Sequence, residues 1–306
     1  MKKTRLLALL VAVVLSVPFY AESQSRPGDV DIFMGVELKY RDVFFNGRVF
    51  DFVVNLTPGV KWNMGHDWEL GAQVLVPVIN QFGNSYGDVR IGVASIAKQI
   101  GVGNRWRFKF SGGQFSYNRY GLDVKSMFIA NKWLAFQGEV GLTGYCFFAF
   151  SDSWAASTPE KLTFLVGPQF WIAPWTTQIN VRGGRYVYGD YGAEIEAMRH
   201  FKHTTVGLFA SYSSQAKENA GFRITVMLPP YKSKRRKVNF RPASNFQIDY
   251  RNDGSPYSTR QYSTDPEQNA RQGWFSRDIN PWGPDTMAPD FIYTDGDDRK
   301  EKEDKK

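Results

Sequence analysis

The stretch NRWRFKFSGG, residues 104–113, decides between two kinds of β-protein. Basic and aromatic side chains alternate along it with a strict period of two: Arg105, Trp106, Arg107, Phe108, Lys109 and Phe110. This period predicts a β-strand with one charged face and one aromatic face. In a soluble sandwich the rings would fill the core and the cations would face water. In a membrane barrel the rings face lipid and the cations face the interior.

The composition favours a large β domain with anionic partners. The chain has 306 residues, of which 16% are aromatic and 28 are Gly, and a formal net charge of +8. A basic protein attracts anions in general, which include lipopolysaccharide, acidic polysaccharides and nucleic acid. The only cysteine, Cys146, excludes an intrachain disulfide.

Residues 1–25 predict a secretory signal peptide. Lys2, Lys3 and Arg5 precede an apolar run over residues 6–17, and small residues follow, so we expect cleavage between residues 21 and 26. The apolar run falls short of the roughly 20 residues of a spanning helix. The alternative, an N-terminal membrane anchor, lacks a stop-transfer pattern. Export also argues against nucleic acid as a partner.

Residues 30–228 are a series of alternating segments of about ten residues, separated by Gly, Asn, Asp and Pro turns. We count about twelve strands, with a hairpin at GVGN, residues 101–104, and late strands starting near residues 161, 177, 191, 204 and 220. The prediction is an all-β fold: an antiparallel transmembrane β-barrel over residues 26–230, with a polar, partly disordered C-terminal tail over residues 231–306. An even strand number places both termini in the periplasm.

Three features favour the barrel over a sandwich. The strands have the length that a tilted strand needs to cross a bilayer, about nine to eleven residues. Small residues recur on the non-aromatic face, at Gly71, Gly92 and Ser111. Trp and Tyr residues near the strand ends resemble an aromatic girdle: Tyr40, Trp62, Trp68, Trp106, Trp133, Trp171, Trp175 and Tyr186.

In a barrel the rings of residues 104–113 face lipid, and the basic residues of three neighbouring segments line the interior. These candidate ligand-binding residues are Arg90, Lys98, Arg105, Arg107, Lys109 and Lys125. They would contact an anionic polymer, with Glu194 and Glu196 compensating part of the charge elsewhere. The alternative is that these charges only pair with one another across a plugged interior.

The tail, residues 231–306, differs from the strands in its sequence pattern: it has no long apolar period. Five of the six residues 232–237 are basic, and they either bind lipid phosphates or form a positively charged stop after the last strand. Trp274, Phe275 and Trp282 indicate that the middle of the tail docks on the barrel mouth or on a periplasmic envelope protein. The mixed-charge end, DGDDRKEKEDKK, is typical of disorder.

The sequence shows no clear catalytic or metal-binding pattern. His66 lies in an expected turn, and His200 and His203 flank another turn, with Ser211, Ser213 and Ser214 on the next segment. A lipid hydrolase or acyltransferase with His200 or His203 and a nearby Ser is therefore one alternative. The HxxH pair lacks further metal ligands, so we expect no metal and no cofactor. The preferred expectation is a non-enzymatic protein.

The closing strand GFRITVMLPP and the tail segment YRNDGSPYSTRQYSTDPEQN, within residues 221–269, resemble the YjbH-type family of outer-membrane proteins associated with exopolysaccharide and capsule biosynthesis. Members are often much longer, so this chain would correspond to one barrel unit. The resemblance implies an outer-membrane barrel that assists export or surface assembly of a polysaccharide, and it carries over no catalytic residue. The remaining alternative is a soluble secreted β-sandwich that binds its partner with the basic strands.

Overall fold

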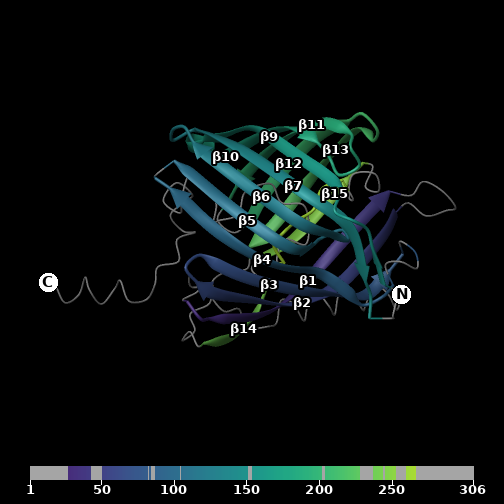
Figure 1. Ribbon diagram of the computed structural model, residues 1–306. Coiled ribbons are helices and arrows are strands. Elements are labelled where there is room, and N and C mark those ends of the chain that lie inside the picture. The colour runs from purple at the N-terminus through teal and green to yellow at the C-terminus, as the bar shows by residue number, and fades with distance from the viewer. Residues whose placement is uncertain are drawn as a thin grey trace.

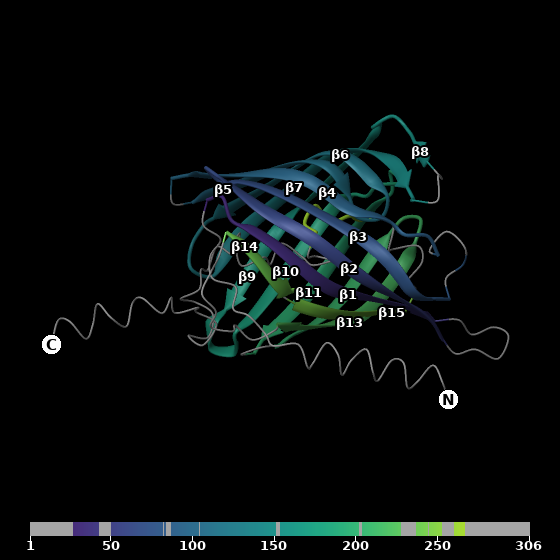
Figure 2. The ribbon, with the colours of Figure 1, turned by 90° about the horizontal axis from the view of Figure 1, so that it is seen from below.

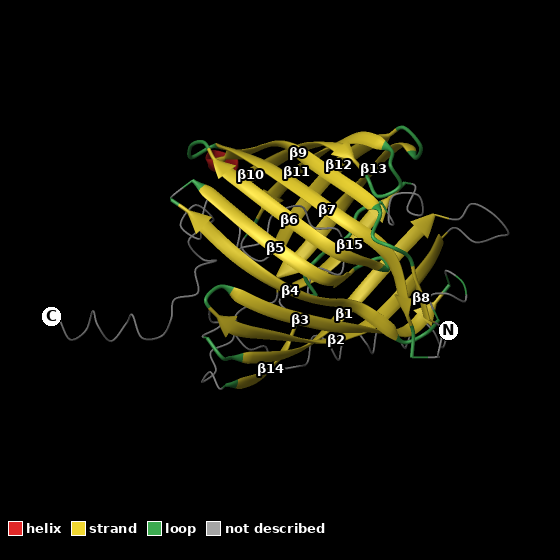
Figure 3. Cartoon of the chain, viewed as in Figure 1, coloured by secondary structure: helices red, strands yellow, loops and turns green. Residues whose placement is uncertain are grey.

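The computed structural model describes residues 27–42, 50–81, 83, 87–103, 105–150, 154–201, 204–227, 237–243, 245–252 and 260–266. Within these ranges the protein forms one 15-stranded, mostly antiparallel sheet (Figures 1 and 3). A single turn of 3-10 helix, Ala173–Trp175, joins two of the strands. The prediction of an all-β, antiparallel fold is confirmed. The strands exceed the expected twelve because three short ones are added, one between two predicted strands and two in the tail.

The strands follow the predicted segments closely, and most are longer than the strands of ordinary soluble domains. Their bounds are β1 Val30–Asp42, β2 Phe50–Gly65, β3 Trp68–Asn80, β4 Arg90–Val102, β5 Trp106–Phe115, β6 Arg119–Ile129, β7 Leu134–Phe148, β8 Trp154–Ala156, β9 Lys161–Ile172, β10 Thr177–Arg185, β11 Tyr191–His200, β12 Thr204–Ser213, β13 Lys217–Met227, β14 Val238–Pro242 and β15 Asn245–Arg251. Successive strands pair with one another from β1 to β7 and from β9 to β13, with β9 on β7. The predicted hairpin between β4 and β5 is confirmed.

The two ends of the strand order are β14 and β15, which only two residues separate in the chain. β14 runs parallel to β1, and the buried Arg241 Nε lies 3.2 Å from Asp31 Oδ2 across this pair. β15 runs antiparallel to β13. The sheet therefore continues past residue 230, where we expected the tail to begin, and it curls so that β1 and β15 come close together (Figures 1 and 2). No hydrogen-bonded pairing closes it among the described residues, so closure into a barrel stays a prediction.

The two faces of the sheet carry opposite kinds of side chain. We call inner the face on which residues 260–266 lie, and outer the opposite face. On β5 the outer Trp106 and Phe110 are 42% and 43% exposed, whereas the inner Lys109 is only 6% exposed. The aromatic rings of the opening stretch are therefore not packed in a core, and the lysine between them does not point to solvent. This is the reverse of a soluble sandwich.

A β-bulge at Gly92 changes which residues of β4 face inward. The pairing with β3 steps from Gln73↔Val93 to Val74↔Ile91, so Gly92 is an extra residue on β4. A bulge shifts the alternation by one residue. Arg90 therefore lies opposite the buried Leu75 on the inner face, although a strict period of two would place it on the outer face.

Most of the expected girdle residues are exposed, but two are buried. Trp62, Trp68 and Trp106 are exposed on the outer face, and Trp133 and Trp175 are exposed in the connections between strands. For Trp171 and Tyr186 the prediction is wrong, since these side chains are only 4% and 2% exposed. Trp171 packs with Met127 and Ala135 in a small apolar cluster.

No helix in the described ranges has the length and hydropathy needed to cross a bilayer. The predicted signal peptide, residues 1–25, lies outside the described residues, and so do Trp274, Phe275, Trp282 and most of the basic cluster at residues 232–237.

We expect a disulfide between cysteines placed at Val226 and Phe246, in a background where Cys146 is replaced by Ser. These residues are directly opposite each other in the β13–β15 pair, which brings their Cβ atoms within bonding range. The matched control is Val226→Cys with Ile248→Cys, two residues out of register. Mass spectrometry of the oxidised protein measures the outcome, and equal bridging in both variants would contradict the observed register.

Candidate functional site

The inner face holds a segment of the tail, residues 260–266, that belongs to no strand. Its backbone is hydrogen-bonded to the sheet: the Ser263 N–H donates to Ser116 Oγ at 2.7 Å, and the Ser116 N–H donates to the Ser263 carbonyl at 3.0 Å. Ser95 Oγ donates to the Thr264 carbonyl at 2.7 Å. Ser263, Thr264 and Asp265 are all buried. A segment without secondary structure can be buried in this way because the sheet satisfies its polar groups.

Two glycines of the sheet make room for this segment. A Cβ atom at Gly71 on β3 would lie 2.6 Å from Pro266 Cγ, and one at Gly141 on β7 would overlap the Tyr262 hydroxyl. The Tyr262 ring stacks on Phe115 with 5.3 Å between the ring centroids, and its hydroxyl donates to Asp123 Oδ2 at 3.1 Å. Glycine on an inner strand position thus marks a close approach of another chain segment.

Two lysines lie directly opposite each other on β5 and β6. Lys109 pairs with Lys125, and Lys125 pairs in turn with Glu139 on β7, so the three residues form one row on the inner face. Like charges directly opposite each other are unfavourable on a sheet. They are compensated here because Lys125 Nζ lies 4.0 Å from Glu139 Oε1, and Lys109 Nζ lies 3.9 Å from Asp265 Oδ2.

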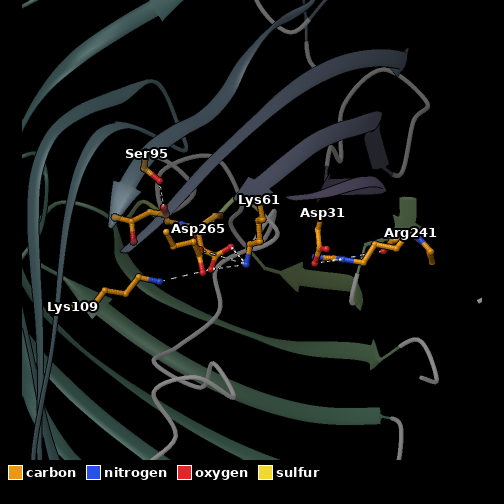
Figure 4. Close-up of polar contacts among 10 residues, drawn as sticks. Asp31, Lys61, Ser95, Lys109, Arg241 and Asp265 are labelled. Carbon is orange, nitrogen blue, oxygen red and sulfur yellow. Dashed lines mark hydrogen bonds and ion pairs between the residues drawn. The ribbon is translucent and has the colours of Figure 1, made fainter. Parts of the chain in front are cut away.

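Asp265 also pairs with Lys61 on β2, whose Nζ lies 3.2 Å from Asp265 Oδ1 (Figure 4). The ammonium groups of Lys61 and Lys109, from two strands that are not neighbours, therefore converge on one carboxylate (Figure 4). We call Lys61, Lys109 and Asp265 the lysine clamp. Lys61 Nζ has a second, longer contact of 3.8 Å with Glu69.

Elsewhere on the inner face, basic and acidic residues of the strands pair with one another. Arg182 on β10 donates to Glu194 on β11 at 2.7 Å. Arg223 on β13 pairs with Glu196 on β11 and, at 3.8 Å, with Asp249 on β15. The expected compensation by Glu194 and Glu196 is thus present. Buried charges need such partners, because removal of one leaves the other desolvated without compensation.

A cluster of neutral amides extends the inner face over β7, β9 and β10. Gln137, Gln169, Gln178 and Asn180 are each at most 2% exposed. Gln178 Nε2 donates to Asn180 Oδ1 at 2.9 Å, whereas both side-chain polar atoms of Gln137 and of Gln169 have no hydrogen-bond partner among the described residues. Buried amides are normally hydrogen-bonded, often to water, so these groups have hydrogen-bonding capacity for water or for a hydroxyl-rich ligand.

The structure brings together only part of the predicted basic face. Lys109 and Lys125 lie side by side on the inner face, and Arg90 lies on that face near the other end of the strands. For Lys98 the predicted placement is wrong. Lys98 pairs with the outer residues Phe110 and Trp68, and its Nζ lies 4.9 Å from the Trp68 ring centroid. The bulge at Gly92 is the reason that Arg90 and Lys98 face opposite sides.

Arg105 and Arg107 lie at the β4–β5 hairpin, on the turn side of Lys109. Arg105 is exposed and precedes the first residue of β5. Arg107 Nη1 donates to the carbonyl groups of Gly103 and Trp106, so its side chain folds back on the turn.

The histidines and serines considered for catalysis form no nucleophile–base pair within the described ranges. His200 is buried, and its Nδ1 lies 2.9 Å from Thr205 Oγ1. His66 is exposed in the β2–β3 turn, and His203 lies outside the described residues. The part of the chain that the structure describes also contains no cluster of three or more His, Cys, Asp or Glu side chains that could hold a metal ion.

Lys61, Tyr262 and Asp265 were not predicted from the sequence. Lys61 follows Pro58 and Gly59, which are typical of a turn, and QYSTDP at residues 261–266 has no apolar period that would predict burial. Gly71 could have indicated that another segment lies against β3, since a glycine within a strand is typical of a close approach by other atoms. It does not indicate which segment approaches.

No protein-family model matches the chain, and no curated protein sequence matches it. The resemblance to the YjbH-type family therefore stays a prediction.

Replacement of Arg182 by Met should lower the free energy of unfolding by about 3–5 kcal/mol, because the buried Glu194 then loses the guanidinium group that lies 2.7 Å from it. The double variant Arg182→Met, Glu194→Leu should recover most of this loss. The exposed Lys161→Met serves as control and should change stability by less than about 0.5 kcal/mol. Urea unfolding followed by tryptophan fluorescence measures all three, and a double variant as unstable as Arg182→Met would contradict the pairing argument.

Proposed function

We propose that this chain is an outer-membrane β-barrel that assists export or surface assembly of an anionic exopolysaccharide and performs no catalysis itself. The observation that carries the proposal is the reversed exposure on β5, where Phe110 is 43% exposed and the neighbouring Lys109 is 6% exposed. A protein whose apolar groups face outward and whose charges face inward has the side-chain distribution of a transmembrane barrel.

Contacts at the two ends of the strand order support closure into a barrel. Tyr250 on β15 stacks on Phe222 of β13 with ring centroids 5.2 Å apart, and it lies 5.4 Å from the ring of Tyr40 on β1. Tyr250, on the last strand of the order, thus contacts β1, the strand next to the other end. The chain connection supports closure as well. β14 pairs with β1, and β15, which follows β14 in the chain, pairs with β13. A closed sheet leaves no unpaired edge in the bilayer.

The polymer-related part of the proposal rests on the basic inner face and on the family resemblance. Lys61, Lys109, Lys125 and Arg90 offer cations at several positions along the interior. Cations of this kind attract the carboxylates of an acidic polysaccharide, while amides such as Gln137 and Gln169 suit sugar hydroxyl groups. Outer-membrane lipid and lipopolysaccharide are the partners of the outer face.

No observation favours the alternative of a lipid hydrolase or acyltransferase, because the imidazole of His200 is buried and faces the hydroxyl of Thr205. A soluble β-sandwich fits less well, since it would expose large apolar residues to water over many strands, among them Leu122, Val140, Val166 and Leu208.

Val140→Lys should impair membrane assembly. Val140 is 51% exposed on the outer face in the middle of β7, and a lysine facing lipid near the bilayer centre costs about 2–4 kcal/mol. In a soluble protein the same exposed substitution would be close to neutral. The measurement is the fraction of protein in the outer-membrane pellet that shows heat-modifiable mobility on electrophoresis.

The control is Glu160→Lys in the exposed loop before β9, which should leave the membrane fraction unchanged. The barrel proposal would be wrong if the wild-type protein were extracted without detergent and showed no mobility shift on heating.

Lys109→Gln should reduce the amount of polymer at the cell surface several-fold, because it removes one of the inner-face cations that attract the polymer. Lys98→Gln is the matched control, since it removes a lysine from the outer face of the neighbouring strand. Surface polymer is quantified in cells with equal amounts of assembled barrel. If the two variants export equally, the inner face is not the contact surface for the polymer.

A further inference from the structure

The lysine clamp differs from the other inner-face ion pairs in the origin of its carboxylate. In the pairs Lys125–Glu139 and Arg182–Glu194, both partners belong to strands of the sheet. In the lysine clamp, both cations belong to strands, and the carboxylate of Asp265 belongs to a segment that is not part of the sheet. The strands therefore place two lysines around one anion position, with Glu69 of β3 as a longer contact at 3.8 Å from Lys61, and the chain's own tail fills that position.

The surroundings of the clamp have hydrogen-bonding capacity left over. Ser111 lies two residues from Lys109 on the inner face of β5, and Gln73 lies two residues from Gly71 on β3. Both side chains are only 3% exposed, and neither Ser111 Oγ nor Gln73 Nε2 has a hydrogen-bond partner in the described part of the chain. Buried hydroxyl and amide groups without partners are costly, and they point to a ligand with its own hydroxyl groups.

We propose that Asp265 occupies the place of a sugar carboxylate. Lys61 and Lys109 form the anion site for a carboxylate-bearing polysaccharide, and Ser111 and Gln73 hydrogen-bond hydroxyl groups of the same sugar. The 260–266 segment is then a self-ligand that leaves the clamp when the polymer binds. This inference rests on the proposed function, because it names the substrate class of the inner face as a polymer of uronate type.

The segment can leave without breaking any strand pairing, because it is held by side-chain contacts, by hydrogen bonds to Ser116 and Ser95 and by the stack of Tyr262 on Phe115. The principal contacts are Arg260 with Asp190 at 2.8 Å, Tyr262 with Asp123 at 3.1 Å, and Asp265 with the two lysines. A polymer that supplies a carboxylate to both lysines removes the last of these and competes directly with the segment. Binding of the polymer and burial of the segment therefore exclude each other.

The test uses the full-length protein with Cys146→Ser and a single reporter cysteine, Thr264→Cys. Thr264 is 2% exposed, and its contact with Ser95 uses the backbone carbonyl, which the substitution retains. Labelling of the buried thiol by a maleimide reports how often the segment leaves the inner face. Polygalacturonate should accelerate labelling in a concentration-dependent way, and neutral dextran should not. Equal effects of the two polymers would overturn the proposal, and an equal effect of dextran sulfate would overturn its assignment to carboxylates.

Asp265→Asn in this background should accelerate labelling about tenfold without any polymer, because the charge-assisted contacts to both lysines are lost. Asp67→Asn is the matched control. It also removes one carboxylate, but in the exposed β2–β3 turn at a φ of 63°, a conformation that Asn tolerates. Equal labelling rates of the two variants would overturn the role of Asp265.

A second variant keeps the proposal testable if Asp265→Asn does not assemble. Ser116→Cys with Ser263→Cys, again with Cys146→Ser, joins two residues whose main chains are already hydrogen-bonded. The oxidised protein should lose polygalacturonate binding in co-sedimentation with proteoliposomes and regain it on reduction. Equal binding in both states, or failure of the bridge to form, would overturn the proposal. If polygalacturonate accelerates labelling as expected while deletion of the protein leaves polymer export unchanged, the proposed function is wrong. The assignment of Lys61 and Lys109 as an anion site is then retained.

Discussion

The structure depends on the pairing of charges that the sheet shields from solvent. Lys109, Lys125, Arg182 and Arg223 lie on the inner face, where an isolated ion would be strongly destabilised. Each has a carboxylate within reach, in most cases from a neighbouring strand. The requirement links strand register to electrostatics, because a shift of one residue in any pair would move a charge to the apolar outer face and leave its partner alone.

The same requirement explains why part of the tail is buried. The directly opposed pair of Lys109 and Lys125 has one carboxylate within the sheet, Glu139, and takes a second one from Asp265. The rest of the segment fits the interior by shape, through Tyr262 on Phe115 and through the space left by Gly141. Electrostatics and shape therefore select the same seven residues of the tail, residues 260–266, for the inner face.

Local patterns predicted the long strands well. The starts expected near residues 161, 177, 191 and 204 agree with those of β9 to β12, since alternation and turn residues are properties of neighbouring positions. The inward direction of Lys109 could also be predicted, once the choice between sandwich and barrel was made. The bulge at Gly92 could not be predicted, because nothing in the residues of this segment marks one of them as unpaired. The bulge nevertheless puts Arg90 on the opposite face from Lys98.

Long-range pairing could not be predicted from local patterns either. β14 and β15 are short and carry charges, and they are strands because they pair with β1 and β13. The position of Asp265 between Lys61 and Lys109 likewise depends on contacts across more than 150 residues of chain, which no local period encodes.

The location of β14 and β15 has a consequence for biogenesis. The strand that covers the free edge of β1 is synthesised some 200 residues after β1. Until then the edge of β1 is a template for pairing with any other chain. The edge of β1 therefore stays open to pairing until residues 238–242 have been synthesised, and a chain truncated before that point keeps this edge uncovered.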